Sequence, residues 1–83
     1  MNYFLYILKS INNPKSYVGI TNDLSRRLLE HNSGKNFYTK RHIPWVMIYN
    51  EKYDNLENAR KREKYLKSAV GRKFLKKLFN REK

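Results

Sequence analysis

The apolar residues of the first half of the chain follow the patterns of β-strands. Residues 2–9 (NYFLYILK) form a continuous aromatic and aliphatic run, which is typical of a strand buried on both faces. Residues 10–15 (SINNPK) are rich in turn-forming residues, and residues 16–20 (SYVGI) resume the apolar pattern. A third run covers residues 45–53 (WVMIYNEKY). The pattern predicts a β-hairpin and, later in the chain, a third strand.

Side-chain alternation within this hairpin brings two tyrosines together. Tyr6 and Leu8 share one face of the first strand. With a turn centred near residues 12–13, Tyr17 and Gly19 of the second strand face the same side. Because Gly19 has no side chain, we expect a hollow beside the two tyrosines.

Helical spacing appears between the second and third strands. Thr21 and Asn22 are candidate N-caps, and the helix is expected to end near Asn32, just before a Ser-Gly pair. Its buried side is predicted to consist of three leucines, Leu24, Leu28 and Leu29.

Two further helices are predicted after the third strand. Asp54 with Glu57 three residues later forms a capping-box pattern, and Ser68 suits the start of a last helix. The order is therefore β-β-α-β-α-α, with the first two strands joined as a hairpin. This order predicts an α+β fold in which a small three-stranded antiparallel sheet is flanked by helices. A chain of 83 residues is expected to form a single domain, residues 1–83.

The second of the three predicted helices carries an unusual residue on its apolar face. Leu56, Ala59, Glu63 and Leu66 lie at i, i+3, i+7 and i+10, so a carboxylate interrupts an otherwise apolar stripe. Burial of a carboxylate is costly unless it is paired or bound to a metal. One interpretation is that Glu63 tilts outward and pairs with a basic neighbour. The other is that Glu63 binds a metal ion at the floor of a cleft.

The charge of the chain changes the picture further. Nineteen Lys and Arg stand against seven Asp and Glu, which gives a formal net charge of +12, and eleven of the nineteen lie from Arg60 onward. Clustered basic residues of this kind indicate a polyanionic partner, of which nucleic acid is the usual one. An anionic membrane surface, association with the ribosome, or a merely cationic surface are the alternatives.

Several classes of site are excluded. The chain has no cysteine, so it has neither disulfides nor cysteine-ligated zinc, which fits a reducing cytoplasm. No apolar run approaches the ~18 residues that a membrane-spanning helix needs, and no basic segment precedes a long apolar one at the N-terminus. We therefore expect a cytoplasmic protein. No obligate protein partner is evident, and the oligomeric state is left open.

The polar groups that remain in plausible positions form a small set. They are two phenols, a guanidinium, an imidazole and a carboxylate: Tyr6, Tyr17, Arg27, His31 and Glu63. Arg27 and His31 lie at i and i+4, so they project from the same side of the first helix. A single carboxylate with waters and a phosphate oxygen suits Mg²⁺, which keeps much of its hydration shell. It suits zinc poorly.

At these residues the sequence resembles the GIY-YIG nucleases, in particular their small single-domain bacterial members. Phe4-Leu5-Tyr6 stands where the first tripeptide of the family falls, without its glycine, and Tyr17-Val18-Gly19 stands where the second falls. Arg27 and His31 then follow in one helix and Glu63 in a later one. The phrases YVGITNDLSRRLLEHNSGK and YTKRHIPWVMIY add to the likeness, which covers nearly the whole chain.

The resemblance implies metal-dependent hydrolysis of phosphodiester bonds. Glu63 would hold one Mg²⁺ or Mn²⁺ ion that polarises the scissile phosphate. Arg27 would neutralise charge on the phosphoryl oxygens. Tyr6 would orient or deprotonate the attacking water, with Tyr17 beside it and His31 as the acceptor of the proton. The family also has a late asparagine, for which the candidate here is Asn80. For its additional histidine or tyrosine, the candidates are the residues at Tyr38, Lys40 and His42.

Two functions stay open at this point. One is a catalytic nuclease with a repair or processing role, for which DNA is the expected substrate. The other is a non-catalytic basic module that binds nucleic acid and keeps the nuclease fold. Both require cationic contacts to phosphates. The candidates are Lys35, Lys40, Arg41, Arg60, Lys64, Lys67, Lys73, Lys76 and Lys77.

Overall fold

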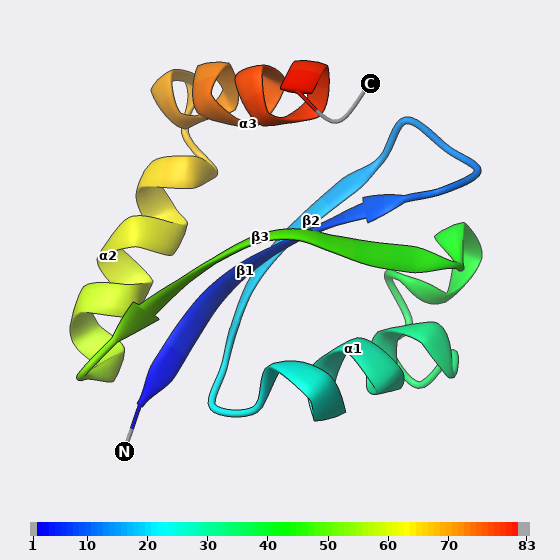
Figure 1. The fold of residues 1–83 in the computed structure, drawn as a ribbon, viewed down its shortest axis with the longest axis horizontal. Helices are drawn as coiled ribbons and strands as arrows, with labels where there is room; N and C mark the ends of the chain where they lie inside the picture. The colour runs from blue at the N-terminus through cyan, green and yellow to red at the C-terminus, as the bar shows by residue number, and fades with distance from the viewer. Residues whose placement is uncertain (1, 82–83) are drawn as a thin grey trace.

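The protein is built on a three-stranded antiparallel sheet (Figure 1). The computed structural model describes residues 2–81. The strands are β1 (Tyr3–Ser10), β2 (Ser16–Thr21) and β3 (Trp45–Tyr53), and their order across the sheet is β2-β1-β3. The central place of β1 agrees with its unbroken apolar sequence, because only a central strand with both faces covered buries every side chain of such a run.

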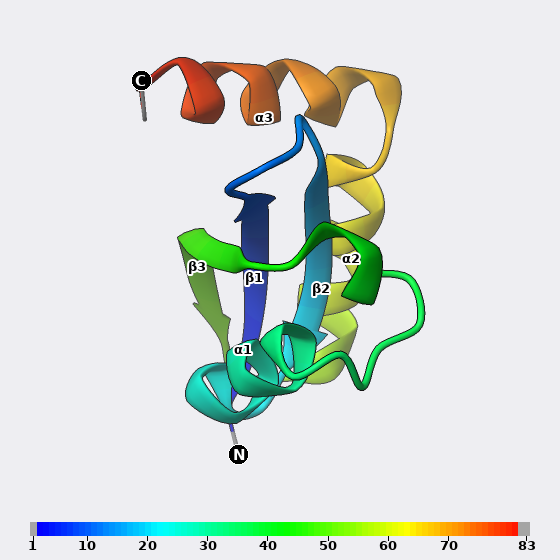
Figure 2. The same ribbon diagram turned by 90° about the vertical axis from the view of Figure 1, so that its right-hand side faces the viewer.

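Helices cover both faces of the sheet. Helix α1 (Leu24–Asn32) packs on one face, and α2 (Leu56–Leu66) and α3 (Ala69–Arg81) pack on the other. A short 3₁₀ helix, η1 (Lys40–His42), lies in the connection from α1 to β3. Figure 2 shows α2 running beside β2, with α1 across the opposite side of the sheet. The predicted α+β architecture and its β-β-α-β-α-α order are confirmed.

Each face of the sheet has its own core. The core under α2 and α3 is formed by Leu5, Ile7, Val18 and Leu66, with apolar residues of α3 packed against it. The core under α1 is formed by Tyr6, Leu8 and Trp45, with Leu24 and Leu28 packed against it. The alternating faces of β1 therefore divide its side chains between two cores, as the sequence predicts.

The hairpin register brings the two tyrosines and the glycine together as predicted. Tyr6 pairs with Gly19 across the sheet, and Leu8 pairs with Tyr17. A Cβ atom on Gly19 would lie 2.5 Å from the Tyr6 hydroxyl oxygen and 2.9 Å from a ring carbon of Tyr17. The missing side chain thus leaves the space that the Tyr6 hydroxyl occupies.

The caps and one leucine differ from prediction. Asp23, rather than Thr21 or Asn22, is the N-cap of α1, and Asn55 rather than Asp54 is the N-cap of α2. Adjacent short polar residues cap equally well on sequence grounds, and the exit path of the preceding strand selects one of them. Leu29 is 71% exposed instead of buried, because His31 takes the third position on the sheet-facing side of α1 after Leu24 and Leu28.

Two contacts fix α2 in place. Arg62 donates to both carboxylate oxygens of Glu51 on β3, and the hydroxyls of Tyr49 and Tyr53 donate to the same carboxylate. At the other end of the helix, a Cβ atom on Gly71 would lie 2.2 Å from the carbonyl oxygen of Tyr65, so α3 can approach α2 this closely only with glycine there. These contacts set the face that α2 presents to β2.

None of the helices within residues 2–81 has the length and apolar character needed to cross a membrane.

Candidate active site

A cleft of about 530 Å³ opens at the edge of the sheet, where α1 and α2 flank β2. Its walls are formed by residues of β1, β2, α1 and α2. The lining residues include four of the five predicted site residues, Tyr6, Tyr17, Arg27 and Glu63, together with Gly19, Asn22, Arg26, Glu30 and Arg60. The fifth, His31, lies behind the wall and is fully buried.

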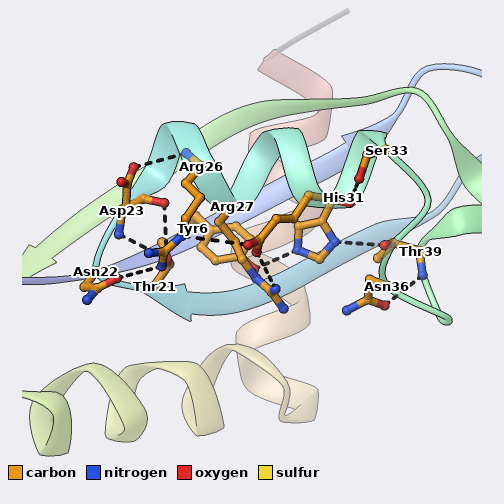
Figure 3. Close-up of polar contacts among 11 residues, drawn as sticks. Tyr6, Thr21, Asn22, Asp23, Arg26, Arg27, His31, Ser33, Asn36 and Thr39 are labelled. Atoms are coloured by element: carbon orange, nitrogen blue, oxygen red, sulfur yellow. Dashed lines mark hydrogen bonds and ion pairs between the residues drawn. The ribbon is translucent and has the colours of Figure 1, made fainter.

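The Tyr6 hydroxyl is the centre of the polar contacts in this cleft (Figure 3). Arg27 Nε donates to the Tyr6 oxygen at 3.2 Å, and His31 Nε2 lies 2.9 Å from the same oxygen. Strand β1 supplies the tyrosine, and adjacent turns of α1 supply the two partners. The i, i+4 spacing of Arg27 and His31 therefore lets one helix face hold a single phenol from two sides.

Burial dominates the ionisation of Tyr6. It raises the pKa of Tyr6 to about 12, although the hydrogen bond and positive charge of Arg27 act in the opposite direction. The negative charge of Glu63 adds a small further increase in this pKa, so the carboxylate is close enough to affect the phenol. At pH 7 only about one phenol in 10⁵ is ionised at such a pKa. Tyr6 is thus a neutral hydroxyl in the resting site.

His31 is buried between two hydroxyl groups. Its Nδ1 lies 2.8 Å from Thr39 Oγ1, and its Nε2 faces Tyr6. Burial and the nearby charge of Arg27 hold the pKa of His31 below its usual value, so the ring is neutral at pH 7. A neutral ring with a proton on Nδ1 can donate to Thr39 and accept from Tyr6 at Nε2.

Arg27 is held by two partners. Besides Tyr6 it contacts Glu30, whose Oε1 lies 3.0 Å from the Arg27 Nη1 atom. The hydrogen bond to Tyr6 and that to Glu30 raise the pKa of Arg27 further above its already high usual value. The guanidinium is therefore a fixed positive charge on the wall of the cleft.

Glu63 combines features of both sequence interpretations. Its side chain is 27% exposed, and Lys67 one turn later pairs with it at 3.2 Å. It nevertheless lines the cleft and faces the site of Tyr6 and Arg27. No group of three His, Asp or Glu side chains converges anywhere in residues 2–81. The donor set consequently fits an ion that takes one carboxylate and completes its shell with water and substrate oxygens, as Mg²⁺ does.

Tyr17 closes the inner end of the cleft. Its ring centroid lies 4.9 Å from that of His31 and 6.2 Å from that of Tyr6. On its other side, Tyr38 of the loop before β3 lies 6.0 Å away. Tyr17 thus separates the Tyr6 site from the surface beyond it.

The predicted cationic residues are distributed unevenly around the cleft. Arg60 lines it, whereas Lys67 pairs with Glu63 and lines a second pocket on the surface beyond Tyr17. Lys40 and Arg41 stack on the ring of Phe37. The remaining predicted phosphate contacts are exposed and line neither the cleft nor the surface beyond Tyr17: Lys35, Lys64, Lys73, Lys76 and Lys77.

The structure separates two of the additional candidates from the cleft. Asn80 is exposed on α3 and is not among the lining residues. His42 packs its ring edge-on against Trp45, and its buried Nδ1 lacks a hydrogen-bond partner within residues 2–81. Tyr38 lies beside Tyr17, which lines the cleft, whereas the Lys40 ammonium lies over the ring of Phe37.

Two residues of the site were missed by sequence reasoning. Thr39 is fully buried against His31, and Glu30 orients Arg27. Glu30 could have been found from its i+3 spacing to Arg27. Thr39 carries no such signal, because it approaches His31 from a loop.

The chain matches known proteins over nearly its whole length. The sequence model of the GIY-YIG catalytic domain matches residues 2–78. The chain belongs to the GIY-YIG family. The match extends from β1 to α3, so it includes every element that lines the cleft.

Several similar proteins are bacterial members of the group named UPF0213. The UPF0213 protein YazA of Bacillus subtilis is 37% identical over 83 residues, which is 99% of this chain and 81% of that protein. UPF0213 protein SERP0126 of Staphylococcus epidermidis is 36% identical, with coverage of 89% and 90%. The solution NMR structure of UPF0213 protein BH0048 from Bacillus halodurans is 31% identical, covers 94% of this chain and 85% of its own, and superposes with a TM-score of 0.56. This GIY-YIG protein therefore shares both sequence and fold with that group.

Proposed function

We propose that the protein is a metal-dependent nuclease that hydrolyses phosphodiester bonds in nucleic acid, with DNA as the substrate. The observation that supports this most strongly is the position of the Tyr6 hydroxyl. It lies in a cleft between a fixed cation, Arg27, and a neutral buried imidazole, His31. Membership of the GIY-YIG family supports the same class of reaction.

The water that attacks the phosphorus loses its proton to Tyr6. Because the pKa of Tyr6 is about 12, prior ionisation of the phenol is rare and a stepwise tyrosinate route is unfavourable. The Tyr6 oxygen instead accepts the proton of the water while its own proton passes to His31 Nε2. The Nδ1–H donated to Thr39 keeps the ring oriented with Nε2 as the acceptor. The new P–O bond forms as the bond to the 3′ oxygen breaks.

Two charged groups complete the site. Arg27 faces the cleft with its charge fixed by Glu30 and Tyr6, and it offsets the negative charge that accumulates on the phosphoryl oxygens. Glu63 is the residue that would hold Mg²⁺ or Mn²⁺. The bound ion would polarise the scissile phosphate and stabilise the leaving oxygen. For this, the ammonium of Lys67 must move from the carboxylate to a phosphate of the substrate.

A strand-cleavage assay with Mg²⁺ and single- and double-stranded DNA tests this proposal. Glu63→Gln should lower the cleavage rate by at least ~10², and Tyr6→Phe should do the same, since each removes a group that acts on the reacting atoms. The matched control is Glu57→Gln on the same helix, because Glu57 is exposed and does not line the cleft. It should cleave at the wild-type rate.

The outcomes separate the two functions that the sequence leaves open. Normal turnover by Glu63→Gln would contradict the role of that carboxylate, and normal turnover by Tyr6→Phe would contradict the proton relay. DNA binding by the wild type without cleavage in either Mg²⁺ or Mn²⁺ would identify a non-catalytic binding module instead. Circular dichroism of each variant distinguishes lost chemistry from lost folding.

A further inference from the structure

A second pocket lies next to the cleft, on the far side of Tyr17. It is a groove of about 390 Å³ along β2, at the edge of the sheet. Its floor is apolar and includes Val18 and Leu75, whereas Lys67 and Arg72 line it as cations and Tyr38 as an aromatic side chain. Its lining contains no acidic residue within residues 2–81. Its charge therefore matches an anionic occupant.

The groove adjoins the cleft, because Tyr17 lines both and stands between them. A nucleic-acid strand with one phosphate near Tyr6 can therefore place its neighbouring nucleotide beside Tyr17 and Tyr38. Lys67 also joins the two sites, since it pairs with Glu63 and lines the groove. Lys67 therefore lies where the two pockets meet.

Tyr38 is exposed yet held in position. Its side chain is 60% exposed, and its ring centroid lies 6.0 Å from that of Tyr17. Its backbone N–H donates to Asn36 Oδ1, and the next residue, Thr39, donates to the same oxygen and is anchored on His31. The loop consequently presents the ring at the groove from a fixed backbone.

Building on the proposed function, we infer that this groove binds an unpaired nucleobase, that of the nucleotide adjacent to the scissile phosphate. The base lies against the ring of Tyr38 and over the apolar floor, and Lys67 and Arg72 contact the flanking phosphates. Stacking on an aromatic side chain requires a free base face, which a continuous duplex does not offer. The protein therefore favours single strands, flaps or frayed ends over intact duplex.

Binding in EDTA tests this inference without any cleavage. Anisotropy titrations would use the full chain with three fluorescein-labelled probes of matched charge: a short oligothymidylate, an abasic strand of the same length and a hairpin duplex. Tyr38→Ala should weaken binding of oligothymidylate by a factor between about 5 and 150, which corresponds to ~1–3 kcal/mol for one stacked base. It should leave the affinities for the abasic strand and the duplex unchanged.

The chain offers a close control. Phe37→Ala removes the neighbouring aromatic residue, which is 72% exposed but lines neither the cleft nor the groove. This variant should bind oligothymidylate within about twofold of the wild type, because a side chain outside the groove forms no base stack. Tyr38→Trp keeps an aromatic face and should retain wild-type affinity.

Three results would overturn the inference. The first is that Tyr38→Ala loses as much affinity for the abasic strand as for oligothymidylate. The second is that Phe37→Ala loses as much affinity for oligothymidylate as Tyr38→Ala does. The third is that Tyr38→Trp binds oligothymidylate as weakly as Tyr38→Ala. Absence of single-strand binding by the wild type would overturn it as well. Failure of the proposed nuclease reaction is recognised separately, since it appears in the cleavage assay and leaves these binding comparisons intact.

Discussion

Replacement of Glu51 by Gln should destabilise the protein far more than an ordinary surface change. Glu51 is 19% exposed and its partner Arg62 is 28% exposed, so both charges are largely removed from water. The carboxylate accepts from Tyr49, from Tyr53 at 2.6 Å, and from Arg62 at 3.0 and 3.1 Å. Gln keeps the shape but turns one acceptor into a donor and removes the charge.

The size of the effect follows from the degree of burial. Exposed ion pairs contribute ~0–1 kcal/mol, whereas breaking a fully buried pair costs ~3–5 kcal/mol. The bidentate geometry and low exposure place Glu51 between these limits. We expect Glu51→Gln to lower the free energy of unfolding by about 2–3 kcal/mol, which for a domain of this size lowers Tm by roughly 10–20 °C.

The dependence on pH identifies the charge as the cause. Burial alone raises the pKa of Glu51, but the hydrogen bonds from Tyr49, Tyr53 and Arg62 outweigh it and hold this pKa below its usual value. A depressed folded-state pKa stabilises the protein above the unfolded-state pKa, and this stability is lost as the pH falls through the folded-state pKa. The difference in free energy of unfolding between wild type and Glu51→Gln should therefore be constant near neutral pH and become smaller under acid conditions.

Urea denaturation followed by circular dichroism measures these differences. The control is Glu57→Gln, which removes an exposed i,i+4 pair at 3.8 Å and should change stability by at most ~0.5 kcal/mol. The reasoning would be refuted if Glu51→Gln lowered the free energy of unfolding no more than this control does. It would also be refuted if Glu51→Gln caused a large loss of stability that stayed the same down to acid pH.

Three further predictions concern the cleft and the basic surface. Gly19→Ala should reduce the cleavage rate by at least ~10² while the protein stays folded, because the new methyl group would lie 2.5 Å from the Tyr6 hydroxyl and displace it. Full activity of this variant would show that the position of the hydroxyl is not critical. The cleavage rate should be constant from neutral pH down to about 6.5 and fall only below it, because the relay needs neutral His31 and burial lowers the pKa of this ring. A fall in rate that begins above pH 7 would argue against His31 as the proton acceptor. Changing Lys73, Lys76 and Lys77 together to Ala should weaken binding to two unrelated DNA duplexes equally and flatten the slope of log K against log salt by up to ~3, whereas an unchanged slope would place the phosphate contacts on other basic residues.

Much of the fold was predictable because its signals are local. The third strand spans residues 45–53 as its apolar run predicts, and α1 ends at Asn32, just before the Ser-Gly pair. The pairing of Tyr6 with Gly19 follows from a short turn and the two-residue period of strands, which leave little freedom in the register. The errors, such as the N-cap at Asn55 and the exposed Leu29, occurred where neighbouring residues offer equal local chemistry.

The candidate site was predictable in its membership but not in its workings. The roles of Tyr6, Arg27 and Glu63 came from the resemblance to a family, since the residue pattern alone also allowed Glu63 to tilt outward and pair with a basic neighbour. The contacts of Tyr6 with Arg27 and His31 join residues 21 and 25 positions apart, and they exist only because α1 packs against the sheet. Spacing along the chain does not determine distances of that kind.

The sequence by itself determined the elements, their order, the hairpin register and the cationic character of the protein, because these depend on local pattern and composition. Tertiary structure alone decided that Thr39 contacts His31, that Arg62 pairs with Glu51, and that Tyr38 lies beside Tyr17. It also decided the ionisation of Tyr6, whose pKa of about 12 results from burial. Burial and long-range contacts are properties of packed elements, and no stretch of the chain carries them alone.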